Sequence, residues 1–316
     1  MAEVIRDVVT LGEAMVVVRP PDGAPVAEAT SFVMGVAGAE SNLAIGLARL
    51  AHRVAFVGRV GADAAGTRVR RTLRGEGVDV DALQTMSDVP TGLLVRDATG
   101  TRGISVDYHR AGSAGSQLSS EDLDGDLIVS ARFLYVTGLT CGLSAAAHGA
   151  VTAAVQMARD AGRTVVLDPN LRSKLQDLAT WRELVAPFLH SADIVVGSAA
   201  ELRTVTAAPD DDTAITRTRD AGVGLLVVRS GTAPVRVIDA DTERQVPVAR
   251  VAPTDPVGAG DAFSVGLLSG LLDGLATLDA VARAQQVARR CVLVRGDIEG
   301  LPTRDQLLDD DDEVAR

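Results

Sequence analysis

The most informative segment of this sequence is Asp255-Pro-Val-Gly-Ala-Gly-Asp261. It runs directly into Ala262-Phe-Ser-Val-Gly-Leu-Leu268, whose apolar residues recur at helical spacing. We therefore expect Gly258 to Asp261 to form the N-terminus of a helix, where backbone N–H groups lack partners and the helix dipole favours negative charge. The small residues at 258 to 260 would let a phosphate group approach the backbone, so this segment is a candidate anion site.

Asp261 is the unusual member of the segment, because a carboxylate would repel a phosphate group bound at the same point. Its position makes sense if it accepts a proton from an attacking hydroxyl group while the N–H groups stabilise charge on a transferred phosphoryl group. The alternative is that Asp261 only caps a helix behind a glycine-rich turn. The segment by itself leaves both interpretations open.

Two common nucleotide-binding motifs are absent from the sequence. A P-loop requires Gly-Lys-Ser/Thr, but the only lysine, Lys174, is followed by Leu175. The dinucleotide fingerprint Gly-x-Gly-x-x-Gly also fails, because the third glycine after Gly258 and Gly260 would fall on Phe263. The sequence therefore excludes a Walker-type NTPase and disfavours a Rossmann dehydrogenase.

The composition of the chain limits the kinds of partner and the cellular location that we expect for it. Its 316 residues are 47% hydrophobic, which is enough to bury a large core, and its net charge of −11 disfavours nucleic acid and membrane surfaces as partners. The first residues, MAEVIRDVVT, lack the pattern of a signal peptide, and no stretch of about 18 apolar residues could cross a bilayer. Since only Cys141 and Cys291 are present, we expect a reduced, cytoplasmic protein with a small-molecule partner.

Segments with the patterns of strands and helices alternate along much of the chain. Strand-length apolar runs cover residues 4–11, 54–60, 133–137, 164–167, 194–196 and 225–228. Stretches with helical spacing include residues 41–50, 145–161 and 181–189. This alternation predicts an α/β fold in which helices cover both faces of a mostly parallel sheet.

Residues 91–108 interrupt this alternation. Two short segments, Gly92-Leu-Leu-Val-Arg96 and Ile104-Ser-Val-Asp-Tyr108, flank the glycine-containing turn 97–103, a pattern typical of a hairpin. We expect a single domain of residues 1–316 with an inserted β-sheet lid, built from segments of about 13–19, 31–35 and 88–110. The acidic tail, residues 309–313, is expected to be a solvated end.

Two separated motifs together resemble one known family. Gly35-Val-Ala-Gly-Ala-Glu-Ser-Asn42 resembles a glycine pair followed by a sugar-binding asparagine, although Ala37 replaces the first glycine. The second motif is the segment 255–261. Together with residues 57–66, the two motifs resemble those of the ribokinase-like (PfkB) carbohydrate kinases, and most of all those of the 2-keto-3-deoxygluconate kinases. The resemblance covers residues 8–302. The resemblance implies a ribokinase-like fold of about eight or more strands with a β lid, Asp261 as catalytic base, and an anion hole at Gly258, Ala259 and Gly260.

The resemblance also implies sites for ATP and Mg²⁺. Ser198-Ala-Ala-Glu201 is similar to an Asn-x-x-Glu element whose carboxylate organises the metal ion, so Glu201 is the candidate metal residue. The alternative for Glu201 is an ordinary acidic residue in the first turn of a helix. Val228-Arg-Ser-Gly231 is similar to a loop along the nucleotide phosphates. The implied nucleotide contacts are Ser198, Arg229, Ser230, Gly231, Asp255, Gly258, Gly260 and Gln285.

The candidate substrate residues point to a sugar acid. Tyr108, Arg110 and Arg172 match positions at which the 2-keto-3-deoxygluconate kinases contact their substrate, and guanidinium groups bind carboxylates bidentately. Gly38 and Asn42 complete the implied pocket. The alternative for each arginine is a structural ion pair. Some fructokinases also have the Asp-Pro-Asn-x-Arg pattern, and Leu94 stands where a 2-keto-3-deoxygluconate kinase can have a lid tyrosine.

The sequence therefore predicts an ATP- and Mg²⁺-dependent kinase acting on a primary hydroxyl group of a sugar acid, with 2-keto-3-deoxygluconate as the first choice. A fructokinase or another neutral-sugar or nucleoside kinase of the family is one alternative. A non-catalytic sugar-sensing protein is another, which the intact Asp261 argues against. Because lid strands in this family often pair between subunits, a homodimer or larger homo-oligomer is expected.

Overall fold

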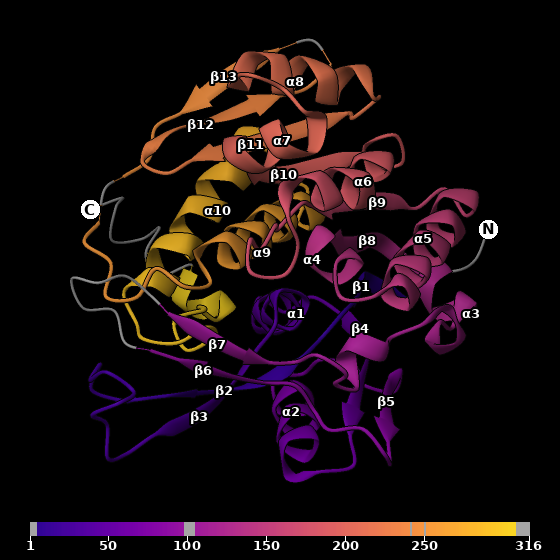
Figure 1. Cartoon of the computed structure of the whole chain (residues 1–316). Coiled ribbons are helices and arrows are strands. Elements are labelled where there is room, and N and C mark those ends of the chain that lie inside the picture. Colours follow the sequence, from indigo (N-terminus) through magenta and orange to yellow (C-terminus); the bar gives the residue numbers. More distant parts are fainter. Residues whose placement is uncertain (1–4, 98–104, 241, 250, 308–316) are drawn as a thin grey trace.

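The structure is a computed structural model and describes residues 5–97, 105–240, 242–249 and 251–307 (Figure 1). Val4 of the first expected strand, most of the expected turn at 97–103 with Ile104, and the acidic tail at 309–313 lie outside the described residues. The described strands form two sheets, one of nine strands and one of four. We call them the central sheet and the small sheet.

The central sheet is parallel from β11 to β5 and ends in two antiparallel strands, β12 and β13. The parallel strands are apolar runs buried on both faces, as expected for a sheet covered on both sides. All six strands that the apolar runs predicted are present in the central sheet. In spatial order the strands are β13 (Glu243–Val246), β12 (Ala233–Ile238), β11 (Leu225–Ser230), β10 (Ile194–Ser198), β9 (Thr164–Asp168), β8 (Ala131–Thr137), β1 (Arg6–Leu11), β4 (Val54–Gly61) and β5 (Leu83–Met86).

Helices cover both faces of the central sheet, because successive side chains of a strand point to opposite sides. In β9, Val166 packs into one hydrophobic cluster, whereas Val165 and Leu167 pack into the other. The cluster of Val166 includes α1 (Ala39–Arg49), α2 (Ala64–Gly75), α9 (Ala259–Leu272) and α10 (Thr277–Val292). The opposite cluster includes α3 (Gly125–Val129), α4 (Gly138–Cys141), α5 (Ala145–Asp160), α6 (Leu178–Leu189), α7 (Ala199–Thr206) and α8 (Asp211–Asp220).

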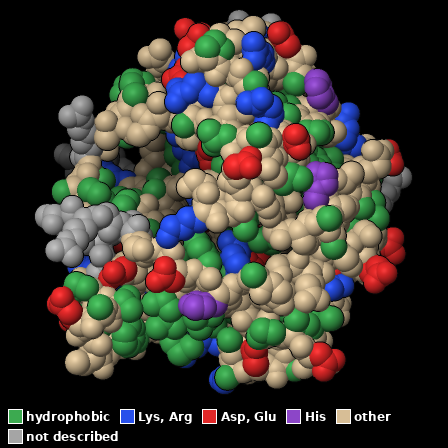
Figure 2. All heavy atoms as spheres, viewed as in Figure 1, with side chains coloured by type: hydrophobic (Ala, Val, Ile, Leu, Met, Phe, Trp, Pro, Cys, Tyr) green, Lys and Arg blue, Asp and Glu red, His purple; other side chains and the backbone are tan. Residues whose placement is uncertain are grey.

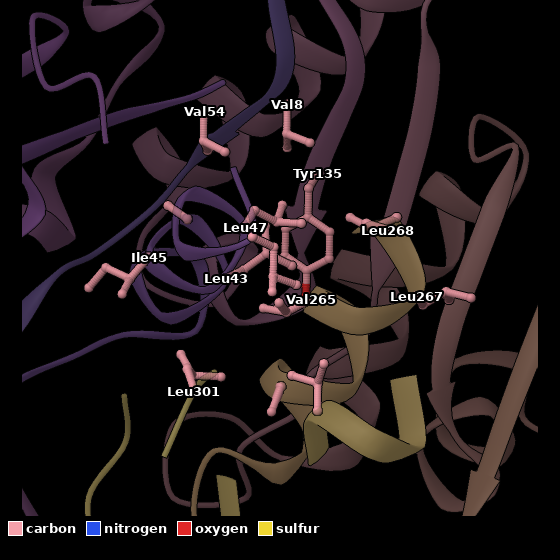
Figure 3. Close-up of a cluster of buried hydrophobic side chains, with 14 of the residues drawn as sticks. Val8, Leu43, Ile45, Leu47, Val54, Tyr135, Val265, Leu267, Leu268 and Leu301 are labelled. Carbon is pink, nitrogen blue, oxygen red and sulfur yellow. The ribbon is translucent and has the colours of Figure 1, made fainter. Parts of the chain in front are cut away.

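Helix α9 is buried on nearly all sides, which explains why its sequence has no polar face. It packs between α1 and α10. Glycines allow the close approach, since a Cβ atom on Gly46 would lie 2.5 Å from Val265 and one on Gly266 would lie 2.6 Å from the Cα of Ala284. Figure 3 shows Val265 of α9 and Leu43 of α1 in the cluster around Tyr135. The start of α9, and with it Asp261, is therefore anchored in the core.

The small sheet lies against one end of this body, on the side of α1 and α2 (Figure 1). Its strand order is β3-β2-β6-β7, with antiparallel outer pairs and a parallel β2–β6 pair. The strands are β2 (Met15–Arg19), β3 (Val33–Ala37), β6 (Leu93–Arg96) and β7 (Val106–His109). The three segments in which short strands were expected are thus brought together in one sheet.

Candidate active site

Asp261 lies buried in the first turn of α9 and is held by two amide groups. Its Oδ2 accepts a hydrogen bond from Asn42 Nδ2 at 2.8 Å, and its Oδ1 accepts one from Asn170 Nδ2 at 3.3 Å. Asn42 comes from α1 and Asn170 from the turn after β9, which are 219 and 91 residues away in the sequence. Three elements therefore fix the orientation of one carboxylate.

The electrostatic surroundings of Asp261 suit a proton acceptor. Burial raises the pKa of its carboxyl group, while the charge of Arg172, the hydrogen bonds from Asn42 and Asn170, and the charge of Arg229 act in the opposite direction. A raised pKa makes the ionised carboxylate a better base. The side chain thus combines fixed geometry with increased basicity.

Asn170 is a site residue that sequence reasoning missed. Its backbone has φ of +43°, a left-handed conformation that costs energy in a residue other than glycine and is concentrated at functional sites. Its amide oxygen is buried without a hydrogen-bond partner among the described residues, and so is that of Asn42. Because the amide nitrogens of both residues donate to Asp261, both oxygens remain available to accept hydrogen bonds from a ligand.

Gly38 positions Asn42 at the start of α1. It is the N-cap of that helix, with φ of +143°, and its carbonyl accepts hydrogen bonds from Asn42 N at 2.8 Å and Ser41 Oγ at 2.9 Å. A Cβ atom at this position would overlap the carbonyl oxygen of Glu13. Only glycine therefore satisfies both the backbone angle and the space available at Gly38.

The segment Gly258–Asp261, which we call the anion loop, has the predicted helix-start geometry. Gly258 is the N-cap of α9 in the left-handed conformation, and no side chain caps the helix, so the N–H groups of Gly260 and Asp261 can face a ligand. The N–H group of Ala259 makes a long hydrogen bond of 3.4 Å to the carbonyl of Pro256. A Cβ atom on Gly260 would lie 2.8 Å from Nη1 of Arg229. The Arg229 guanidinium thus adds positive charge beside the helix N-terminus, and its Nε has no hydrogen-bond partner among the described residues.

Asp168 is a second residue that sequence reasoning did not assign to the site. It is fully buried at the end of β9, and Tyr135 Oη and Ser264 Oγ donate to its Oδ2 at 3.2 and 3.3 Å. Its Oδ1 accepts from the backbone N–H of Asn170 at 3.1 Å. Burial, partly opposed by Arg229, raises the pKa of Asp168 to about 7. Asp168 therefore supports the turn that presents Asn170.

Arg110 and Tyr108 lie on the small-sheet side of the site. The Arg110 guanidinium stacks on the Tyr108 ring at 5.2 Å and forms a buried ion pair with Glu13, which also accepts a hydrogen bond from Ser113 Oγ at 2.7 Å. The ion-pair alternative considered for Arg110 is therefore realised in part. Its Nη2 is the atom that pairs with Glu13, whereas its Nε lacks a partner among the described residues, so one donor remains for a ligand.

Arg172 differs from Arg110 in being exposed. It follows the left-handed turn at Asn170, and its positive charge opposes the rise in the pKa of Asp261, so it lies on the side of the site that holds Asp261. Within the described part of the chain, no hydrogen bond or ion pair engages its guanidinium group. Its charge is therefore open to an anionic ligand.

Ser198 and Glu201 form a capping box at the start of α7. Glu201 Oε2 accepts from Ser198 N at 2.7 Å and from Ser198 Oγ at 2.6 Å, while its Oε1 accepts from Leu171 N at 3.0 Å. Both oxygens thus have structural partners. Among the described residues, no group of three or more His, Cys, Asp or Glu side chains is arranged to hold a metal ion.

The remaining candidates for nucleotide contact occupy three different places. Ser230 ends β11 at a shift in strand register, and Gly231 follows with φ of +58°. Gln285 lies on α10, where its amide donates to the carbonyl at the end of β13 at 3.5 Å. Asp255 is buried, and its carboxylate binds Arg96 of the small sheet, a contact that the sequence did not reveal.

The face of the molecule that carries these elements is hollowed. Figure 2 shows Lys and Arg side chains along the hollow between the small sheet and the body of the protein. Positive charge in a concave site favours an anionic ligand. None of the helices in the described ranges is long and apolar enough to cross a bilayer.

Comparisons with known proteins agree with this arrangement. The model of the pfkB family of carbohydrate kinases matches residues 5–304. A 2-dehydro-3-deoxygluconokinase of Bacillus subtilis is 34% identical over 304 residues, covering 95% of this chain and 94% of that protein. A probable fructokinase-6, chloroplastic, of Arabidopsis thaliana is 31% identical over 309 residues, covering 94% of this chain and 80% of that protein.

The fold is also found among solved structures. A protein of E. coli assigned as a ribokinase II, solved in complex with ATP and Mg²⁺, superposes with a TM-score of 0.90, covering 98% of this chain and all of that chain, at 22% identity. The expected ribokinase-like fold is thereby confirmed, as is the resemblance seen in the two motifs. With its family model matched over nearly the whole length, this chain belongs to the pfkB family of carbohydrate kinases.

Proposed function

We propose that this carbohydrate kinase transfers the γ-phosphoryl group of ATP to the terminal C6 hydroxyl of 2-keto-3-deoxygluconate. The observation that carries the proposal is the placement of Asp261. A buried carboxylate, oriented by two amides, stands at an uncapped helix N-terminus beside the guanidinium of Arg229. A base next to an anion site is the arrangement that phosphoryl transfer to a hydroxyl group requires.

In this mechanism Asp261 takes the proton of the attacking hydroxyl group as its oxygen approaches the phosphorus in line. The N–H groups of Gly258, Ala259 and Gly260 stabilise negative charge that develops on the transferred phosphoryl group. Arg229 adds a positive charge on the same side. After transfer, the proton is on the Asp261 carboxyl group, and it is released to solvent before the next turnover.

The residues around the anion loop fit a nucleotide with its metal ion. The glycine at 260 lets the guanidinium of Arg229 approach the loop closely, and the unpaired Nε of Arg229 offers a buried donor. Mg²⁺, when bound, would neutralise phosphate charge. Since both oxygens of Glu201 have structural partners, that side chain would act on the ion through water, and Ser198, Ser230, Gly231 and Gln285 would border the nucleotide.

Three features support an acidic substrate. Arg110 keeps its buried Nε without a partner, and the exposed guanidinium of Arg172 lies near the base, so both side chains could bind a carboxylate or keto group. The free amide oxygens of Asn42 and Asn170 suit sugar hydroxyl groups. The small sheet, with Tyr108 on its inner face, would act as a lid that excludes water.

A neutral-sugar kinase is the second candidate, and one contact favours it. Glu13 already neutralises Arg110, which weakens the attraction of this arginine for a carboxylate. A fructokinase is also among the similar proteins. The geometry of Asp261 argues against a non-catalytic sugar sensor, because such a protein needs no oriented base.

We also propose that the protein is a cytoplasmic homo-oligomer, formed from the single domain with its inserted lid. Phe32, just before the edge strand β3, and Val33 and Met34 at its start expose 44%, 37% and 46% of their surface. An exposed apolar strand edge is suited to pairing with a second copy. Sedimentation of the wild type and of Met34→Lys would show whether this edge forms the contact.

The substrate is tested by ADP release at fixed ATP and Mg²⁺ with 2-keto-3-deoxygluconate, fructose, ribose and a nucleoside. We expect kcat/KM to be highest for the sugar acid. A preference for fructose would keep Asp261 as the base and favour the second candidate. Absence of turnover with all four would contradict the kinase mechanism drawn here.

A further inference from the structure

A buried cluster of charges joins the small sheet to the start of the anion loop. Arg96, the last residue of β6, donates through Nη2 to Asp255 Oδ2 at 2.5 Å and through Nη1 to Asp297 Oδ1 at 2.6 Å. Each of the three residues is only 5% exposed. Because removing one partner leaves buried charge uncompensated, such a cluster holds its segments firmly together.

The two carboxylates shape the backbone that leads into the anion loop. Asp255 Oδ1 accepts a hydrogen bond from Val257 N at 3.2 Å, and its Oδ2 accepts one from Gly296 N at 3.1 Å. The carbonyl of Asp297 lies 2.9 Å from the place where a Cβ atom on Gly258 would stand. The segment at 296–297 therefore packs directly against the first glycine of the loop.

Arg96 projects from the face of the small sheet that carries the proposed substrate contacts. Residues 94 and 96 share one face of β6, since side chains alternate along a strand. Leu94 is paired with Tyr108 across the β6–β7 ladder, and Tyr108 packs with the buried cluster on that face. One side chain thus connects this face of the sheet with the loop that would hold the phosphoryl group.

We propose that Arg96 is a positioning residue that couples the placement of the small sheet to the geometry of the anion loop. When the sheet is in the place seen in this structure, the guanidinium aligns Asp255 and Asp297, and the N–H groups of Gly258 to Gly260 point into the site. Displacement of the sheet would remove this support. The inference rests on the proposed function in that the loop is taken to bind the transferred group.

Arg19 provides a matched control on the same sheet. It ends β2, next to β6, and its Nη2 donates to Glu299 at 2.9 Å and to the carbonyl of Arg295 at 3.1 Å. It therefore ties the small sheet to the same C-terminal segment, but the structure gives it no contact with Asp255. A role limited to holding the sheet predicts the same behaviour for Arg19→Gln and Arg96→Gln.

Hydrogen–deuterium exchange of the backbone amides in residues 254–261 tests the coupling without any substrate. We expect Arg96→Gln to speed exchange in this segment by about tenfold or more, and Arg19→Gln to leave it at the wild-type rate. With the sugar that the wild type phosphorylates, Arg96→Gln should lower kcat by about 10- to 100-fold while the Kd of that sugar changes less than about twofold. Equal exchange in the two variants would overturn the proposal.

A double variant separates the tether from simple charge balance. The cluster carries a net charge of −1 with Arg96, Asp255 and Asp297 all ionised, and Arg96→Gln combined with Asp297→Asn keeps this value. We expect the double variant to remain fast in exchange and slow in turnover, because the link to the small sheet is absent. If the double variant instead had the exchange rate and kcat of the wild type, Arg96 would act only by balancing charge. That result would contradict the positioning role. If Arg96→Gln does not fold, the double variant replaces it in the exchange and kinetic measurements.

Failure of this inference can be told from failure of the proposed function. If the wild type turns over none of the sugars but Arg96→Gln still loosens residues 254–261, the coupling holds and the function is wrong. If the wild type is active but exchange in that segment is unchanged by Arg96→Gln, the function holds and the coupling is wrong.

Discussion

The first turn of α9 and the small sheet border the same site, but very different amounts of structure hold them in place. Helix α9 is buried between α1 and α10 in the larger core, and Asp261 receives hydrogen bonds from two further elements. The small sheet packs Val16 and Val36 into the larger core from one face, and the cluster on its other face has four buried members among the described residues, Met15, Val17, Ala37 and Leu94. The proposed chemistry thus lies on the more deeply buried part, and the proposed substrate selection on the part with the smaller cluster of its own.

This division has a physical reason. A base must stay within hydrogen-bond reach of one proton during transfer, so its position tolerates little error. A surface that admits and covers a substrate must move, and elements with few buried contacts move at the lowest cost in free energy. Substitutions on the two sides should therefore differ in size and in kind.

The largest effect is expected at the base. Asp261→Asn should lower kcat by about a thousandfold or more, because the variant keeps the shape but loses the proton acceptor. Sugar binding and the melting temperature should remain close to those of the wild type. Steady-state kinetics and calorimetry check both, with Asp279→Asn on exposed α10 surface as the control. A variant that retains near-normal kcat would contradict the role of Asp261.

The anion loop should show the next largest effect. In Gly260→Ala the new Cβ atom would lie 2.8 Å from Arg229 Nη1, which must shift the guanidinium or the loop. We expect kcat/KM for ATP to fall by about 10- to 100-fold. Gly75→Ala in α2 adds the same methyl group where no atom lies within 4 Å, so it should leave the kinetics unchanged. A similar loss in both variants would point to a general defect in folding.

On the small-sheet side we expect a change in KM. Arg110→Ala should raise KM for the sugar acid by about tenfold, and should change KM for fructose less, because only the acid offers a carboxylate to the free Nε of Arg110. The value of kcat should change less than the value of KM for the sugar acid. An equal rise in KM for both sugars would mean that Arg110 serves only its ion pair with Glu13.

The smallest effect concerns stability and pH. Burial raises the pKa of Asp168 to about 7, above that of the unfolded chain, so the stability it contributes is present at low pH and is lost as the pH rises through about 7. Between about pH 5.5 and 8.5, the free energy of unfolding should therefore fall by about 1–2 kcal/mol more for the wild type than for Asp168→Asn. Urea unfolding of both proteins at both pH values measures this difference. If the free energy of unfolding changed equally with pH in the two proteins, Asp168 would not titrate as described.

Much of the fold was predictable because it depends on local patterns. Apolar runs such as residues 54–60 are long enough to mark buried strands, and the start of α9 follows from the glycines before Asp261. The short strands of the small sheet were also recognisable, although their order was not. Strand order depends on pairings between distant segments, which single-sequence patterns do not encode.

The site was predictable only in part, for the same reason. Asp261, Asn42 and Gly38 belong to motifs whose residue types carry the signal, and the structure brings them together. Asn170 lies in the segment 168–172, in which only Arg172 was a candidate site residue. Its left-handed backbone conformation could not be predicted from the sequence. Glu13 and Arg96 had no local signal at all, because their partners lie far away in the sequence.

The amino-acid sequence by itself thus determined the α/β alternation, the helix start at Asp261 and the kind of chemistry that a carboxylate beside backbone N–H groups can perform. Only the tertiary structure decided which side chains surround that carboxylate, that Glu13 partly neutralises Arg110, and that Arg96 reaches the anion loop. The physical reason is range. Helix starts and strand periodicity arise from neighbours along the chain, whereas burial, ion pairing and shifted pKa values arise from neighbours in space.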